Sequence, residues 1–177
     1  MVPIYKETFE RGDGMYSAFP NQSSSHRDHV IAWSKDLGRS IDYLETRPDI
    51  DHQKLAYERV SWGAAMGAVF LALENRFKAV VLLNPGFYLQ KCLPEADQLY
   101  FAPHVRVPVL MLNGRFDYMF PPQLSQEPMH RTLGTSKSEK RRVVYDTSRG
   151  LPPTPAIKET LDWLDRYLGP VTQRNTL

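Results

Sequence analysis

The sequence predicts an α/β protein of three layers, in which helices cover both faces of a mostly parallel β-sheet. Two continuously apolar runs, at residues 79–83 and 107–112, are typical of strands that are buried on both faces of a parallel sheet. After residue 27, segments with helical spacing alternate with strand-like runs, which is the pattern of parallel α/β sheets. At 177 residues, 42% of them hydrophobic, the chain has enough apolar material for the core of one domain, residues 1–177.

The elements are predicted in chain order from apolar spacing and from residues that interrupt regular structure. Residues 1–25 form an irregular arm with Gly, Asn and Ser runs, and a helix follows over about 28–45, where apolar residues recur three or four positions apart. The elements that come next are a short strand at 54–60, a helix through about residue 75, the strand at 79–83, an excursion from the sheet at 84–104, a strand within 105–113 and a short strand at 143–145. A last helix follows, with one apolar face and with Gly169-Pro170 as its stop. The residues of that face are Ile157, Leu161, Leu164 and Leu168.

Composition and charge exclude several classes of protein. The formal net charge is +2, and the one basic cluster, Lys137, Lys140, Arg141 and Arg142, is predicted to be a solvated loop edge because no aromatic residues interleave with it. The single cysteine, Cys92, permits neither an intrachain disulfide nor a thiolate metal cluster. No stretch approaches the roughly 20 apolar residues that span a bilayer, and the first residues lack a secretory pattern. We therefore expect a cytoplasmic protein with no membrane or nucleic-acid partner.

The stretch Tyr57–Ala65 joins a predicted strand to a predicted helix and places Ser61 at the corner. A serine on a tight strand-to-helix turn has an exposed hydroxyl beside the first N–H groups of the helix, which suits a nucleophile that attacks a carbonyl. The alternative interpretation is that Ser61 merely N-caps the helix, as serine commonly does.

Ligands of open α/β sheets bind beyond the carboxyl ends of the strands, so the residues that follow each predicted strand are candidate site residues. Ser61 follows the first strand, Asp117 lies in the loop after the third, and Asp146–Gly150 follows the fourth. A serine hydrolase of this architecture needs a nucleophile, an acid and a histidine in that order, because the histidine removes the serine proton and the acid fixes the histidine tautomer. The first two are present, and an Asx-type loop residue is the alternative for Asp117.

With these residues in place, the chain resembles the α/β-hydrolase superfamily, and within it the dienelactone hydrolases and prolyl-oligopeptidase-like esterases. The resemblance covers almost the whole chain and rests on Val60-Ser61-Trp62-Gly63 as the nucleophile elbow, on Pro108–Asp117 as the acid strand and on the last helix. It implies a serine esterase for a small acyl ester or lactone, with Ser61 as nucleophile, the Trp62 N–H as oxyanion donor and Asp117 as triad acid. It implies no metal and no organic cofactor.

Three residues depart from the pattern of that family. Arg149 stands where the family places the triad histidine, and a guanidinium cannot act as a general base because it stays protonated and has no acceptor. Arg59, two residues before Ser61, replaces a small residue and is expected to relax or distort the turn. Glu7 replaces a glycine of a Tyr-Lys-Gly-Thr segment. The histidines of the chain are predicted to be ordinary surface or capping residues, namely His26, His29, His52, His104 and His130.

The resemblance also matches Pro3–Lys6 with the end of the family's fourth strand, so we expect the C-terminal part of a hydrolase domain that lacks the N-terminal strands. The first predicted strand then becomes a sheet edge, and an exposed edge favours marginal stability, aggregation or a homodimer. Substrate pockets are expected from residues 84–104 and from the N-terminal strands that the chain is expected to lack.

Two hypotheses of function follow from these observations. The first is a serine hydrolase that is impaired because Arg149 replaces the histidine, and the second is a catalytically inactive binding or assembly module, a truncated pseudoenzyme. A flavodoxin-like or Rossmann nucleotide binder fits the alternation of elements, but no Gly-x-Gly-x-x-Gly turn follows any predicted strand.

Overall fold

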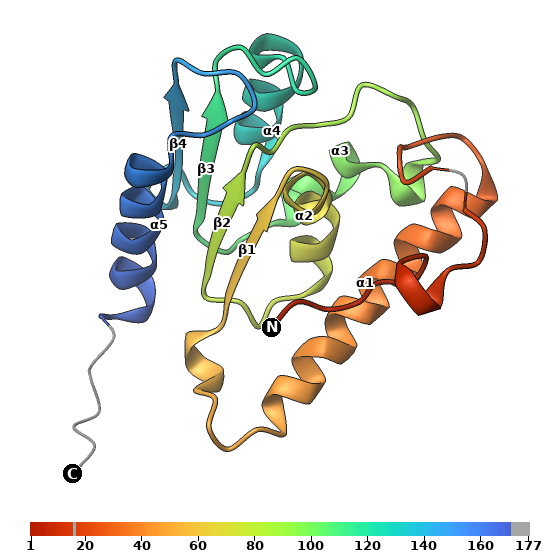
Figure 1. Cartoon of the computed structure of the whole chain (residues 1–177), viewed down its shortest axis with the longest axis horizontal. Coiled ribbons are helices and arrows are strands. Elements are labelled where there is room, and N and C mark those ends of the chain that lie inside the picture. The colour runs from red at the N-terminus through yellow and green to blue at the C-terminus, as the bar shows by residue number, and fades with distance from the viewer. Residues whose placement is uncertain (16, 171–177) are drawn as a thin grey trace.

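The computed structural model describes residues 1–15 and 17–170 and confirms the predicted α/β fold class. Four strands form one sheet in the order β1-β2-β3-β4, and each neighbouring pair is parallel. Helices cover both faces of this sheet, so the domain has three layers (Figure 1). The strands are β1 (Ala56–Val60), β2 (Ala79–Leu83), β3 (Val109–Gly114) and β4 (Lys140–Tyr145).

The helices divide unequally between the two faces of the sheet. Helix α5 (Pro153–Leu168) packs on one face, and the other helices lie on the opposite side (Figure 1). These other helices are α1 (Ser24–Glu45), α2 (Trp62–Leu73), α3 (Gln98–Phe101) and α4 (Glu127–Thr132). Short helical turns lie at Phe9–Arg11, His52–Lys54, Pro94–Ala96, Ala102–His104, Pro122–Gln126 and Lys137–Glu139.

The two central strands explain the apolar runs of the sequence. Successive side chains of a strand point to opposite faces, and here both faces are covered, so β2 and β3 are apolar almost throughout. Burial of each such side chain stabilises the fold by about 1.5–3 kcal/mol. The side chains toward α1, α2 and α4 include Val80, Leu82, Val109 and Met111, and those toward α5 include Val81, Leu110 and Leu112.

Helix α5 is confirmed, but its predicted apolar face is only half buried. Ile157 and Leu161 are 58% and 55% exposed, whereas Ala156 and Trp163 are buried against the sheet. The reason is that α5 packs over β2 and β3. The exposed pair therefore overhangs toward β1, which is an edge strand of the described sheet.

The N-terminal arm ends earlier than predicted. Helix α1 begins at Ser24 because Ser23 caps it, its side chain accepting the N–H of His26 at 3.1 Å. The predicted buried face of this helix is confirmed, with Val30, Trp33, Leu37 and Ile41 each no more than 3% exposed.

Two strands begin elsewhere than predicted. Strand β1 starts at Ala56, since His52–Lys54 form a turn of 3₁₀-helix before it. Strand β4 starts at Lys140, so most of the basic cluster that was predicted as a loop lies in a strand. Charged side chains are common in edge strands, where they reach solvent and discourage pairing with another chain.

The opposite edge of the described sheet is β1, as the resemblance implied. Pairing of two copies through this edge stays a prediction. None of the helices in residues 1–15 and 17–170 is both long enough and apolar enough to cross a membrane.

Gly114, the last residue of β3, lies against the loop that follows β4. A Cβ at this position would lie 1.7 Å from the carbonyl oxygen of Ser148, so the main chain would have to move. We expect Gly114→Ala to lower the free energy of unfolding by about 2 kcal/mol in urea titrations. The matched control is Gly150→Ala, where a Cβ meets nothing within 4 Å. Equal stability of the two variants would contradict this packing.

His26 gives the fold a pH dependence. Its side chain is 3% exposed, and burial, reinforced by the charge of His29, lowers the pKa of His26. Because the imidazole of His26 binds a proton more readily in the unfolded chain than in the folded one, protonation favours unfolding. The contribution of neutral His26 to the free energy of unfolding is therefore fully present above about pH 6.5 and is lost as the pH falls below that value. We expect His26→Leu to flatten the decline of the urea midpoint between about pH 7.5 and pH 5. An unchanged slope would show that His26 is not the group responsible.

Candidate active site

Ser61 occupies a strained corner between β1 and α2. Its backbone has φ 54° and ψ −111°, a combination that residues with a Cβ rarely adopt. The Ser61 N–H donates to the carbonyl of Leu83 at 2.8 Å, which extends the β1–β2 pairing to the corner. Ser61 occupies the N-cap position of α2, as the alternative interpretation held, but its side chain makes no capping hydrogen bond.

Arg59 does not relax this turn, contrary to expectation. Its aliphatic stem lies beside Gly63, where an added Cβ would come within 3.1 Å of the Arg59 Cβ. The Arg59 guanidinium lies over the Tyr57 ring, with 5.6 Å between the Cζ atom and the ring centroid. The glycine in the first turn of α2 therefore provides the room that the long side chain needs, and Ser61 keeps its strained backbone.

Asp117 lies in the loop after β3 and has no exposed side-chain surface. Its Oδ1 atom accepts the N–H of Met119 at 2.9 Å and that of Phe120 at 3.2 Å. Asp117 is thus an Asx-type loop residue, as the alternative interpretation proposed. It also carries a buried negative charge that needs a partner.

Arg149 supplies that partner and joins the two candidate residues. Its Nη1 group donates to both carboxylate oxygens of Asp117, at 3.1 and 3.0 Å, while Nη2 donates to the hydroxyl oxygen of Ser61. One guanidinium therefore connects nucleophile and acid, as a histidine would do in a triad. A guanidinium can only donate, so Arg149 cannot remove the serine proton.

The loop that carries Arg149 is fixed by neighbouring strand ends. Asn84, directly after β2, donates from Nδ2 to the main-chain carbonyl of Arg149 at 2.8 Å. The Phe116 N–H donates to the carbonyl of Thr147 at 2.9 Å, and the Arg149 guanidinium lies 5.3 Å from the centroid of the Phe120 ring. Sequence reasoning missed Asn84, although its place at the carboxyl end of a strand could have indicated it.

None of the five histidines hydrogen-bonds to Ser61 or Asp117 within the described residues. His26 is buried, and its ring centroid lies 6.1 Å from that of Trp33, so the expectation of a surface or capping residue is wrong for it. The reason is that the buried face of α1 already begins in its first turn.

A mainly apolar cavity of about 240 Å³ opens at Ser61. Its other lining residues are Ala18, Phe19, Trp62, Tyr88 and Met119. Burial raises the pKa of Tyr88 to about 12 against the opposing charge of Arg149, so its phenol is neutral at physiological pH. Tyr88 belongs to the predicted excursion, whereas the two lining residues from the N-terminal arm, Ala18 and Phe19, had no predicted role.

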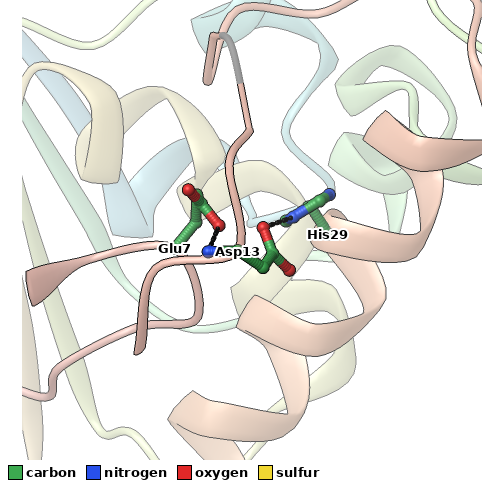
Figure 2. A group of neighbouring side chains, drawn as sticks. All are labelled: Glu7, Asp13 and His29. Carbon is green, nitrogen blue, oxygen red and sulfur yellow. Dashed lines mark hydrogen bonds and ion pairs between the residues drawn. The ribbon is translucent and has the colours of Figure 1, made fainter. Parts of the chain in front are cut away.

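A second cluster lies where the N-terminal arm meets α1, and Figure 2 shows its side chains Glu7, Asp13 and His29. The Glu7 carboxylate accepts N–H groups of Asp13, Gly14 and Met15. Asp13 contacts His29 Nε2 at 3.1 Å and the Lys6 ammonium at 2.8 Å. These three side chains offer metal-ligand atoms, but donors of the chain itself already engage the carboxylates.

No family model matches the chain, and no curated protein matches it. Solved structures do match, among them a cold-adapted esterase from an Arctic intertidal metagenomic library, with 25% identity and a TM-score of 0.62 over 81% of this chain and 60% of the esterase. A Klebsiella pneumoniae protein assigned as a dienelactone hydrolase has 18% identity and a TM-score of 0.64, over 78% of this chain and 62% of its own. An acetyl xylan esterase from Paenibacillus sp. R4 has 15% identity and a TM-score of 0.68, over 90% and 61%.

These similarities confirm the predicted resemblance. The chain has the α/β-hydrolase fold and is related to the α/β-hydrolases, esterases among them. It spans about three fifths of the length of these solved structures.

The strain at Ser61 can be measured as stability. Glycine adopts a positive φ without steric cost, whereas alanine removes the hydroxyl and keeps the Cβ. We expect Ser61→Gly to unfold at a higher urea concentration than Ser61→Ala, with a difference of about 1 kcal/mol. The opposite order would indicate that the turn is not strained.

Proposed function

We propose that this chain is an esterase-type domain for a small acyl ester or lactone, and that Arg149 impairs its hydrolytic step. The observation that carries the proposal is the single guanidinium that bonds to both Ser61 and Asp117. The esterase similarity at 25% identity supports the substrate class.

The site keeps part of what acyl transfer needs. Ser61 stands on a strained elbow, the Trp62 N–H at the start of α2 is the proposed oxyanion donor, and Asp117 is the proposed acid. The missing function is proton removal, because Arg149 has no acceptor atom. Loss of one triad member typically removes most of the rate and leaves the contributions of binding and of the oxyanion site.

The second candidate function is an inactive α/β-hydrolase-like binding or assembly module. A cavity is present at Ser61 although the site has no general base, and a site that can bind a molecule but cannot remove the serine proton favours a binding module. We further propose a cytoplasmic location, an ester-like small molecule as partner, and pairing of two copies through β1. The two functions differ in whether a base alone restores turnover.

Arg149→His should restore that turnover. We expect hydrolysis of p-nitrophenyl acetate to rise at least about 100-fold over the native chain, since a positioned general base typically contributes that much. Because Arg59 leaves the elbow intact, adding Arg59→Gly should change the rate by less than about twofold.

Two variants control this measurement. Arg149→Lys keeps a positive charge at neutral pH and should gain nothing, and Ser61→Ala in the Arg149→His background should abolish the gain. A folded Arg149→His chain with no serine-dependent turnover would contradict the proposed esterase site and favour the binding module.

A further inference from the structure

Arg149 has hydrogen-bonding capacity beyond the bridge. Its two terminal nitrogens serve Asp117 and Ser61, while its Nε–H has no hydrogen-bond partner among the described residues. The side chain is 22% exposed, so a solute in the site can reach it. The guanidinium can therefore bind a further acceptor without releasing Asp117.

The start of α2 offers donors on the other side of Ser61. The first main-chain bond of this 12-residue helix runs from the Ala65 N–H to the Ser61 carbonyl at 2.8 Å. The N–H groups of Trp62 and Gly63 precede that bond and have no acceptor within the part of the chain that the structure describes. Such groups carry the partial positive charge of a helix N-terminus.

The cavity defines the rest of the ligand. Its walls are mostly apolar, with the side chains of Phe19, Tyr88 and Met119, and it opens at Ser61. Arg149 is not itself a lining residue, but its Nη2 group donates to the hydroxyl oxygen of Ser61, which lines the cavity, so the positive charge lies at the edge of the cavity. A volume of about 240 Å³ suits a molecule of about ten non-hydrogen atoms.

We infer that this site binds a small carboxylate whose apolar aryl or alkyl body fills the cavity beside Ser61. A carboxylate has two oxygens, one for the Arg149 guanidinium and one for the first N–H groups of α2. Hydrogen bonds between charged partners are about twice as strong as those between neutral ones, so the permanent charge of Arg149 favours an acid over an ester. The inference rests on the proposed function, since it names the ligand class of the same site.

Phenylacetate and its neutral isostere phenylacetamide test this inference by calorimetric titration of the full chain. We expect the acid to bind at least about tenfold more tightly than the amide. Raising the salt concentration from about 50 to 500 mM should weaken the acid and leave the amide unchanged. Each of three results would overturn the inference: equal affinities for the acid and the amide, no binding of phenylacetate at millimolar concentration, or an affinity for the acid that does not change with salt.

Variants locate the preference at Arg149. Arg149→Gln alone would leave Asp117 with an uncompensated buried charge, so it is combined with Asp117→Asn. The double variant should lose the preference for the acid, whereas Arg115→Gln, which removes an exposed arginine that pairs with Asp146, should keep it. A folded double variant that still prefers the acid would overturn the inference; if it does not fold, the salt titration decides.

Failure of this inference is distinguishable from failure of the proposed function. If Arg149→His gains serine-dependent turnover but the native chain does not prefer phenylacetate, the esterase-type site stands and the carboxylate inference falls. If the native chain prefers phenylacetate but Arg149→His gains no turnover, the carboxylate inference stands and the esterase-type site falls.

Discussion

The bridge from Arg149 to Asp117 and Ser61 is the interaction on which the account of this site depends. A carboxylate without exposed surface is stable only with hydrogen bonds and an opposite charge, and Asp117 obtains both, from two backbone N–H groups and from the guanidinium. That requirement fixes the Arg149 side chain, and its Nη2 group then donates a hydrogen bond to the hydroxyl oxygen of Ser61. The same guanidinium thus satisfies a buried charge and places a donor, with no acceptor atom, at the serine hydroxyl.

The parallel sheet creates this bridge. Ser61, Asn84 and the loop of Asp117 follow three adjacent strands, and the carboxyl ends of parallel strands lie at one edge of the sheet. Ser61 and Arg149 are 88 positions apart in sequence, yet they meet because both follow the carboxyl ends of strands that run parallel, β1 and β4. Close approach of that loop to Gly114 completes the placement.

Sequence reasoning predicted the buried strands and the positions of Ser61 and Asp117, because continuous apolar runs and strand ends depend on local pattern. It placed the start of β4 too late, since charged side chains at a sheet edge resemble a loop. It also missed the room that Gly63 leaves for Arg59, which is a contact between two elements. The bridge itself depends on the rotamer of one arginine, and no spacing in the sequence determines that.

The most direct test of the bridge is nuclear magnetic resonance of the chain with ¹⁵N-labelled arginine, with Arg149→Lys to assign the signal. A guanidinium held by Asp117 and Ser61 should give separate, slowly exchanging Nη–H resonances at neutral pH, and Asp117→Asn should collapse them. Resonances of Arg149 that are averaged by rapid rotation, like those of an exposed arginine such as Arg115, would contradict the account.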